Sequence, residues 1–460
     1  MDPALQRITQ ALGPDAQLAV VGGTVRDRLL GRAGGDWDLA TALLPEAVMV
    51  RAQAAGLRAI PTGLQHGTVT LMEAGVAFEI TTFRGDGDYL DGRRPESVTL
   101  GVSLEQDLAR RDFTINAMAL PAAALEHPDW LAFLVDPHGG RRDLADRLIR
   151  AVGDPMRRFS EDGLRCLRAC RFQAQLGFSI EPATFAAIPR CLEVAGKVAV
   201  ERAFVELTKL LRGPEPERGL TALAETGLLG LWLPELRPMI GCAQNHYHRY
   251  PVWEHVLEVT RRAPAEADLR WAALLHDSGK PAARTVDPKG ETHFYGHEAI
   301  SVSLTQAILT RLRASHALVR QVTALVRHHG THPGPGWGDA ACRRFLKQLL
   351  EDDLTLERWA QFNLADQSGK GFGVEPFLAG HAAMVARLEA LAAQRPPLAV
   401  QSLALDGRAL MALAGRKGGP WLGQLQQYLM EAVLDNPERN QPGPLGELAT
   451  EWLGNRPADR

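Results

Sequence analysis

Two aspartates near the start of the chain have the spacing of a metal-binding pair. Asp36 and Asp38 lie in VVGGTVRDRLLGRAGGDWDLAT, residues 20–41. On a strand, residues two apart project to the same face, so both carboxylates can share a pair of divalent ions, which prefer oxygen ligands. One ion can activate an attacking hydroxyl and the other can neutralise a leaving pyrophosphate. The spacing predicts a catalytic magnesium site, with Glu79 of FEITTF as a candidate third carboxylate.

The glycine pair ahead of these aspartates fits phosphate binding. Gly22 and Gly23 end an apolar run, where backbone without a Cβ lets a ligand approach closely. Arg26 falls in the first turn of the helix expected next, and free amides at a helix start favour phosphate. Alone, a glycine pair is usually a turn and an aspartate pair usually a solvated loop. Their order within 22 residues favours a triphosphate site.

Two later segments carry groups that suit the rest of a nucleotide. In LARRDFTINAMAL, residues 108–120, Arg111 can meet phosphate and Asp112 can accept a hydrogen bond from a ribose 2′-hydroxyl. In SEDGLRCLRACRF, residues 160–172, charged side chains recur every third residue and form a stripe along one side of the expected helix: Asp162, Arg165, Arg168 and Arg171.

This stripe can take the place of a nucleic-acid template. An aspartate accepts from an exocyclic amine while an arginine donates to ring and carbonyl acceptors, so the pair can read cytosine and adenine. Uracil and guanine would set a carbonyl against the carboxylate, at a cost of about 1–3 kcal/mol. The alternative for this segment alone is a surface helix with ion pairs between neighbouring turns.

Histidine is concentrated in the second half of the chain. Ten of the 14 histidines fall within the 87 residues from 246 to 332. Imidazole and carboxylate ligands on separate helices suit divalent transition metals such as nickel, manganese or cobalt, and the later histidines would serve a second ion. Lys280 lies about one helical turn after the adjacent residues His276 and Asp277, and it can pair with a phosphate. The ordered candidate ligands are His255, His276, Asp277, His297, His328 and Asp366, with His329 as an alternative neighbour of the site.

The elements that must position these groups follow from the hydrophobic pattern. Short β-branched runs predict strands at 18–23, 57–61, 67–73 and 76–83, followed by a helix at about 104–120. From about residue 155 onward, apolar residues recur at helical spacing. The pattern predicts an α+β protein: a small N-terminal mixed β-sheet head, an all-α neck and body, and an all-α histidine-rich domain. The expected divisions are 1–150, 151–235, 236–375 and 376–460.

Composition narrows the class of protein. With 45% hydrophobic and 23% charged residues, the chain is globular rather than disordered or fibrous. No membrane segment or targeting signal is predicted, so we expect a cytoplasmic protein. Five cysteines without a CxxC pair indicate reduced core thiols. The net charge of −3 means that any nucleic-acid partner must be held by a local basic surface; nothing indicates the oligomeric state.

The motifs, taken in order, resemble the class II tRNA nucleotidyltransferases of the DNA polymerase beta superfamily. The 20–41 segment resembles their GGxVRDxLLG…DxD signature, residues 108–120 their RRDxTxNA element, residues 136–152 their DP…GxxDLxxRxIR segment, and residues 160–172 their EDxxRxxRAxRF element. The resemblance implies an enzyme that adds C, C and A to tRNA 3′ ends from CTP and ATP with Mg²⁺, and it adds Asn116 to the nucleotide-binding candidates. The histidine-rich set resembles an HD-family phosphohydrolase domain.

Several readings stay open. Enzymes that add only CC lack a flexible segment between the catalytic aspartates and RRD; this chain keeps FRGDGDYLDGRRPESVTL at 83–100, which disfavours that branch. Full CCA addition, A addition alone and poly(A) polymerase activity all fit the head motifs. There are two further alternatives. In the first, the main activity is that of the HD unit, which would hydrolyse nucleotides or cyclic phosphates. In the second, the chain is a non-catalytic RNA-binding module. The intact aspartate pair speaks against both.

Overall fold

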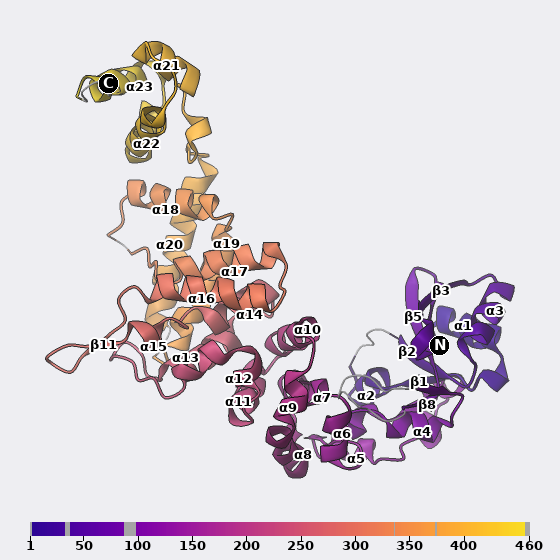
Figure 1. Ribbon diagram of the computed structural model, residues 1–460. Coiled ribbons are helices and arrows are strands. Elements are labelled where there is room, and N and C mark those ends of the chain that lie inside the picture. Colours follow the sequence, from indigo (N-terminus) through magenta and orange to yellow (C-terminus); the bar gives the residue numbers. More distant parts are fainter. Residues whose placement is uncertain (1, 33–36, 87–97, 335, 373–374, 456–460) are drawn as a thin grey trace. The chain divides into compact units, whose positions relative to one another are not determined.

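The computed structural model describes residues 2–32, 37–86, 98–334, 336–372 and 375–455 (Figure 1). Asp36 and most of the 83–100 segment therefore lie outside the described residues. The chain divides into two compact units, Met1–Pro234 and Glu235–Arg460. The division into four domains expected from the sequence stays a prediction. No helix among the described residues is both long and apolar enough to cross a membrane.

The first unit begins with a mixed six-stranded sheet. Its order is β3 (Arg58–Gly63), β4 (Thr68–Glu73), β5 (Val76–Thr82), β2 (Trp37–Thr41), β1 (Ala19–Val21) and β8 (Ala119–Pro121). Strands β2 and β5 are parallel, and the other neighbours in the sheet are antiparallel. The predicted strands at 18–23, 57–61, 67–73 and 76–83 are confirmed as β1, β3, β4 and β5. In β4 and β5 the apolar residues alternate toward a buried face, as Val69 and Leu71 do, whereas β1 is buried throughout.

The helix predicted at about 104–120 is wrong beyond its first turns. Helix α4 covers only Leu104–Ala109, and residues 119–121 form strand β8. Two polar side chains in between make bonds that a continuous helix would not allow: Asp112 accepts from the amide of the next residue, and the Thr114 hydroxyl donates to Asp143 at 2.6 Å. Such local bonds compete with helix formation.

Helices follow the sheet, and the predicted α+β class is confirmed. In the first unit, α7 (Leu164–Leu176) packs against α10 (Val200–Leu211) and α11 (Pro216–Glu225). The contact with α11 depends on Gly219, where a Cβ would lie 2.8 Å from the Cys170 carbonyl oxygen. Cys166 and Cys170 are fully buried in α7, as predicted. Burial raises the pKa of the Cys170 thiol to about 12, which leaves it an inert core group.

The second unit is almost entirely helical. Helix α13 (Val252–Arg262) packs against α14 (Ala267–Leu275) and α19 (Leu356–Gly369), and α14 also contacts α17 (His316–His328). Helix α16 (His297–Arg311) packs against α17, and α20 (Glu375–Ala393) lies against α18 (Asp339–Glu351) and α19.

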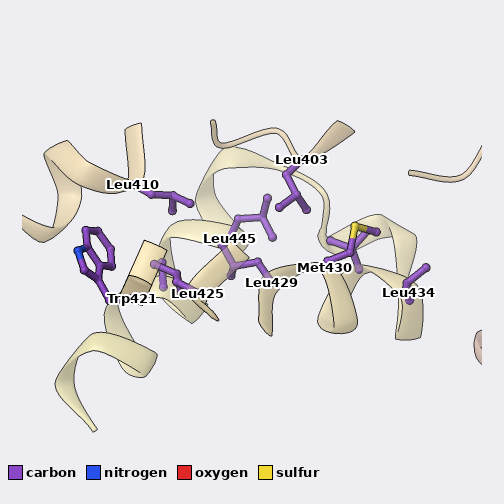
Figure 2. Packing of buried hydrophobic residues seen from close by; sticks show 10 residues of the cluster. Leu403, Leu410, Trp421, Leu425, Leu429, Met430, Leu434 and Leu445 are labelled. Carbon is purple, nitrogen blue, oxygen red and sulfur yellow. The ribbon is translucent and has the colours of Figure 1, made fainter. Parts of the chain in front are cut away.

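The last helices form a small core of their own. Leucines 410, 425, 429 and 445 are fully buried between α21 (Gly407–Ala414), α22 (Pro420–Asp435) and α23 (Pro442–Gly454) (Figure 2). Arg343 of α18 joins this core to the rest of the unit, because its buried guanidinium donates to the carbonyls of Leu434 and Asp435.

Candidate active sites

The sheet brings two predicted carboxylates together. Asp38 on β2 is the register partner of Glu79 on the parallel strand β5. Both side chains are exposed to solvent, so an ion can reach them. Gly22, at the end of β1, lies against the same place: a Cβ there would be 2.9 Å from Arg111 Nη1 and 3.7 Å from Asp38 Oδ2. Its φ of 65° lies in the left-handed region that favours glycine.

These groups line a cavity of about 420 Å³. Its walls carry six arginines and four carboxylates, so positive charge is in excess and favours an anionic ligand. The cavity is therefore a local basic surface of the kind expected for a chain whose net charge is −3. The arginines are 84, 110, 111, 165, 168 and 202, and the carboxylates are Asp38, Glu79, Asp112 and Asp162.

The buried carboxylate of Asp107 orients two of these arginines, Arg110 and Arg111. Asp107 accepts from Arg110 Nη2 at 2.7 Å and from Arg111 Nη2 at 3.2 Å. Burial opposes its ionisation, but Arg110 and Arg111 hold the pKa of Asp107 below its usual value. Asp107 thus fixes both guanidinium groups at the cavity wall.

Asp112 anchors a charged network behind the cavity. Its Oδ2 accepts from Arg168 Nε at 2.7 Å, and its Oδ1 accepts from Asn116 Nδ2 at 3.3 Å. Asn116 in turn accepts from Arg26 Nη1 at 2.8 Å. Burial opposes the charge of Asp112, yet Arg168 lowers its pKa to about 2. Its predicted bond to a ribose hydroxyl stays a prediction.

The proposed base-reading pair is held in place before any base arrives. Asp162, which precedes α7, accepts from the Leu164 amide at 3.0 Å and from Arg202 Nη2 at 2.9 Å. Arg165 donates to Glu161 Oε2 at 2.7 Å and to the carbonyl of Arg110 at 3.0 Å. A side chain fixed in this way loses little entropy on binding.

Arg171, the fourth charged residue of the stripe on α7, does not line the cavity. Arg171 forms an ion pair with Glu206 of α10, donates to Gln175 at 2.5 Å and packs on the Phe172 ring. Burial and the neighbouring Arg168 lower its pKa to about 10. These contacts place Arg171 in the packing of α7 against α10, and its predicted role in binding nucleotide stays a prediction.

Sequence reasoning missed four groups of this site: Glu161, Arg110, Arg202 and Arg84. Glu161 carried a readable signal, because it lies four residues before Arg165 on a helical pattern. Arg110 stands beside Arg111 in the 108–120 motif, and Arg84 begins the short strand β6 (Arg84–Asp86) within the 83–100 segment. Arg202 comes from α10 and lies in no motif.

The second unit contains a buried metal-type cluster. His255 of α13 and His276, after α14, present Nε2 atoms 3.3 Å apart. Asp366 of α19 lies 3.2 Å from His255 Nε2, and Asp277 Oδ2 lies 3.3 Å from His276 Nε2. All four side chains are almost fully buried. The structure thus brings together four of the six predicted ligands: His255, His276, Asp277 and Asp366.

A second group shares Asp277. Its Oδ1 lies 3.4 Å from His297 Nε2 and 3.6 Å from His329 Nε2, and the two Nε2 atoms are 3.1 Å apart. The prediction of His328 at this place is wrong: His328 bonds Asp352 at 2.7 Å, and its neighbour His329 takes the position. Adjacent residues on a helix point about 100° apart, so only one of them can face Asp277.

The donor set fits two divalent cations. Each of the four histidines donates Nδ1–H to a backbone carbonyl, which leaves Nε2 as the free ligand atom. Asp277 Oδ1 accepts no hydrogen bond from any residue that the structure describes. Burial opposes the charge, but Asp277 raises the pKa of His276 to about 10, so this place favours positive charge. Nitrogen and oxygen donors together suit a transition metal.

Comparisons with known proteins find relatives for both units of the chain. The family models described as poly A polymerase head domain, probable RNA and SrmB-binding site of polymerase A, and HD domain match residues 18–150, 177–240 and 247–359. An A-adding tRNA nucleotidyltransferase of Deinococcus radiodurans is 37% identical, over 90% of this chain and 91% of its own. A CCA-adding enzyme of Geobacillus stearothermophilus is 34% identical, over 95% and 92%.

A solved structure is similar over almost the whole length. The crystal structure of the Bacillus stearothermophilus CCA-adding enzyme in complex with CTP superimposes with a TM-score of 0.72 at 30% identity, over 98% of each chain.

Proposed function

Since this chain belongs to the family of tRNA nucleotidyltransferases, we propose that it adds nucleotides to the 3′ end of tRNA, from CTP and ATP and without a nucleic-acid template. Relatives that cover nine-tenths or more of the chain carry names of tRNA enzymes, which favours tRNA over a poly(A) tail as the product. The cytoplasmic location expected from the sequence stays a prediction.

Catalysis in this family depends on divalent metal, and Asp36, Asp38 and Glu79 are the residues that would hold Mg²⁺. Bound there, the metal would activate the tRNA 3′-hydroxyl and stabilise charge on the triphosphate. Arg111, Arg110 and Arg84 bind and orient the phosphates, since their guanidinium groups line the same cavity. The 3′-oxygen bonds to the α-phosphorus as the bond to the bridging oxygen breaks, and pyrophosphate leaves.

One observation carries the proposal: Asp162 and Arg165 lie in one cavity with Asp38. An acceptor and a donor fixed side by side match the amine and the ring acceptor that cytosine and adenine present. Because both bases offer this edge, the same pair serves CTP and ATP. Gly22, Gly23 and Arg26 are the residues that we propose for the triphosphate end, because Gly22 lies against Arg111 and Asp38 at the cavity and Arg26 is joined to Asp112 through Asn116.

The test separates the branches of the family. The purified protein is given tRNA that ends at the discriminator base, or tRNA that ends in CC, with CTP and ATP supplied separately and together. Extension by three nucleotides identifies a CCA-adding enzyme, and use of ATP on the CC end alone identifies an A-adding enzyme. Long A tracts on unrelated RNA would identify a poly(A) polymerase, and no incorporation at all would refute the proposal.

A second activity is favoured by the buried clusters around Asp277. We infer that the HD unit hydrolyses phosphate esters when a transition metal such as nickel, manganese or cobalt is bound. Two cations that share Asp277 would bind a phosphate and lower the pKa of a water. Water oxygen bonds to phosphorus as one ester bond breaks, which would open a 2′,3′-cyclic phosphate. In the full chain, Asp277→Ala should abolish hydrolysis and leave nucleotide addition unchanged; loss of both activities would instead indicate a structural metal.

A further inference from the structure

A second cavity lies beside the HD clusters. It has a volume of about 400 Å³, within the range of small-molecule pockets. Its walls come from α19, α20 and the segment after α17, and they include Trp359, Asn363 and His381. None of its lining residues belongs to the metal-type clusters.

The cavity and the first cluster share helix α19. Asn363 lies three residues before the ligand Asp366, a rise of about 5 Å along the helix. Gln367 connects the two places, because its Nε2 lies 3.3 Å from Asp366 Oδ2 and 3.2 Å from His332 Nε2 at the cavity wall. On the other side, Trp359 Nε1 donates to the carbonyl of His328, the residue before ligand His329.

The walls suit a flat heteroaromatic ring. Trp359 and His381 are stacked at 25° with centroids 6.4 Å apart, and Phe377 lies 5.3 Å from the His381 ring. One edge is polar, because Asn363 Nδ2 lies 3.1 Å from His332 Nδ1. His381 Nε2 is buried and has no hydrogen-bond partner among the described residues, so it is available to a ligand. Aromatic faces with a polar edge are the features that bind nucleobases.

We propose that this cavity is the base subsite of the HD unit, so that the substrate of this unit is a nucleoside phosphate. The base occupies the cavity between Trp359, His381 and Phe377, the ribose spans the short interval along α19, and the phosphate lies at Asp277. The proposal rests on the hydrolase activity proposed above. The nucleoside phosphate is either a free nucleotide or the last residue of an RNA.

Gly380 offers a clean way to fill the cavity. It lines the cavity from within α20, and a Cβ at this position would meet no atom within 4 Å. Gly380→Leu therefore adds bulk to the cavity without a backbone clash, and leucine is the better helix former. Gly423→Leu is the matched control, since Gly423 is also helical and open but lies in α22.

The experiment compares two substrates with the same cyclic ester. Adenosine 2′,3′-cyclic phosphate carries a base, and glycerol 1,2-cyclic phosphate does not. In the full-length protein loaded with Ni²⁺, Mn²⁺ or Co²⁺, Gly380→Leu should lower kcat/KM about tenfold for the adenosine substrate, the scale of one lost base stack. It should leave the glycerol substrate and nucleotide addition to tRNA unchanged, and Gly423→Leu should change none of these. Equal effects on both substrates, or no effect, would overturn the base subsite.

Two further arms complete the test. A short RNA that ends in a 2′,3′-cyclic phosphate shows the source of the base: an equal loss on RNA and mononucleotide assigns the subsite to RNA ends, and a loss on the mononucleotide alone assigns it to free nucleotides. If the wild type hydrolyses neither cyclic ester, the hydrolase proposal fails. Equilibrium dialysis of adenosine against the Asp162→Ala protein, which lacks part of the base-reading pair of the first cavity, with and without Gly380→Leu, then tests the second cavity itself. Weaker binding with leucine supports it, and equal binding refutes it.

Discussion

At the scale of single residues, the nucleotide cavity depends on carboxylates that are kept ionised by arginines. Asp112 is the clearest case, because it is buried and its pKa is lowered to about 2 by Arg168 despite the opposing effect of burial. The ordinary pKa of aspartate is about 3.9, so the folded state favours the charged form by about 2–3 kcal/mol.

A pH dependence of stability follows from this pair. A carboxyl with a lowered pKa stabilises the fold above pH ~4, and that contribution is lost as the pH falls from ~4 to ~2. Asp112→Asn should lower the free energy of unfolding by about 2–3 kcal/mol at pH 7, because Arg168 stays half-buried without its main partner. Urea unfolding at pH 7 and pH 2 checks both points: the two proteins should differ at pH 7 and converge at pH 2. A constant difference would assign the effect to packing.

Replacing the carboxylates proposed to hold Mg²⁺ should remove the chemistry without disturbing the fold. Asp36→Ala or Asp38→Ala should reduce nucleotide addition by several orders of magnitude and leave tRNA binding largely intact, since the arginine walls are unchanged. The assay is single-turnover incorporation of labelled ATP on tRNA ending in CC, with tRNA binding measured in parallel. Asp146→Ala, at an exposed ion pair, is the control. Near-normal incorporation by either variant would refute the two-metal assignment.

Base selection is the third test at this scale. Asp162→Ala or Arg165→Ala should reduce discrimination against UTP and GTP by about 1–3 kcal/mol, the value of one bidentate base contact. Glu161→Gln should weaken selectivity in the same direction, because Glu161 fixes Arg165 through a 2.7 Å bond. The measurement is kcat/KM for each of the four nucleotides. Should Arg165→Ala slow all four equally, its role would be structural.

At the scale of elements, the hydrophobic pattern of the sequence correctly predicted four strands and the helix α7. Strands β1, β3, β4 and β5 follow from short β-branched runs, and α7 follows from apolar residues at helical spacing. The 104–120 segment was mispredicted because its polar residues find partners far away in sequence, such as Asp143 for Thr114. The same limit explains His329, since two adjacent histidines look alike until the helix direction selects one of them.

The α7–α11 contact provides a prediction about packing. Gly219→Ala should destabilise the protein by about 1–3 kcal/mol, because a Cβ would press on the Cys170 carbonyl at 2.8 Å and on Leu210 at 2.9 Å. Gly446→Ala in α23, where nothing lies within 4 Å, should be neutral or should stabilise the protein by about 0.5–1 kcal/mol. Thermal unfolding of both variants checks the difference. Equal melting temperatures would show that α11 can shift without cost.

At the scale of the whole molecule, the proposed hydrolase would supply the end that nucleotide addition requires. Nucleotide addition needs a free 3′-hydroxyl, and a 2′,3′-cyclic phosphate blocks it. A hydrolase in the same chain would open the blocked end and deliver it to the transferase at high local concentration. Asp38 and Asp277 separate the two reactions by mutation, since each belongs to only one site.

The final prediction tests this coupling with one substrate: tRNA that lacks its last nucleotide and ends in a 2′,3′-cyclic phosphate. With ATP, Mg²⁺ and a transition metal, the wild type should extend this tRNA, provided that the hydrolase also removes the remaining phosphate. Asp277→Ala should extend only tRNA with a free hydroxyl, and Asp38→Ala should unblock the end without extending it. Mixing the two variants should restore the product, but more slowly than the wild type at equal and low protein concentration, because the unblocked tRNA must then diffuse between molecules. A mixture as fast as the wild type would show that the tether brings no kinetic advantage, and that the two activities are independent.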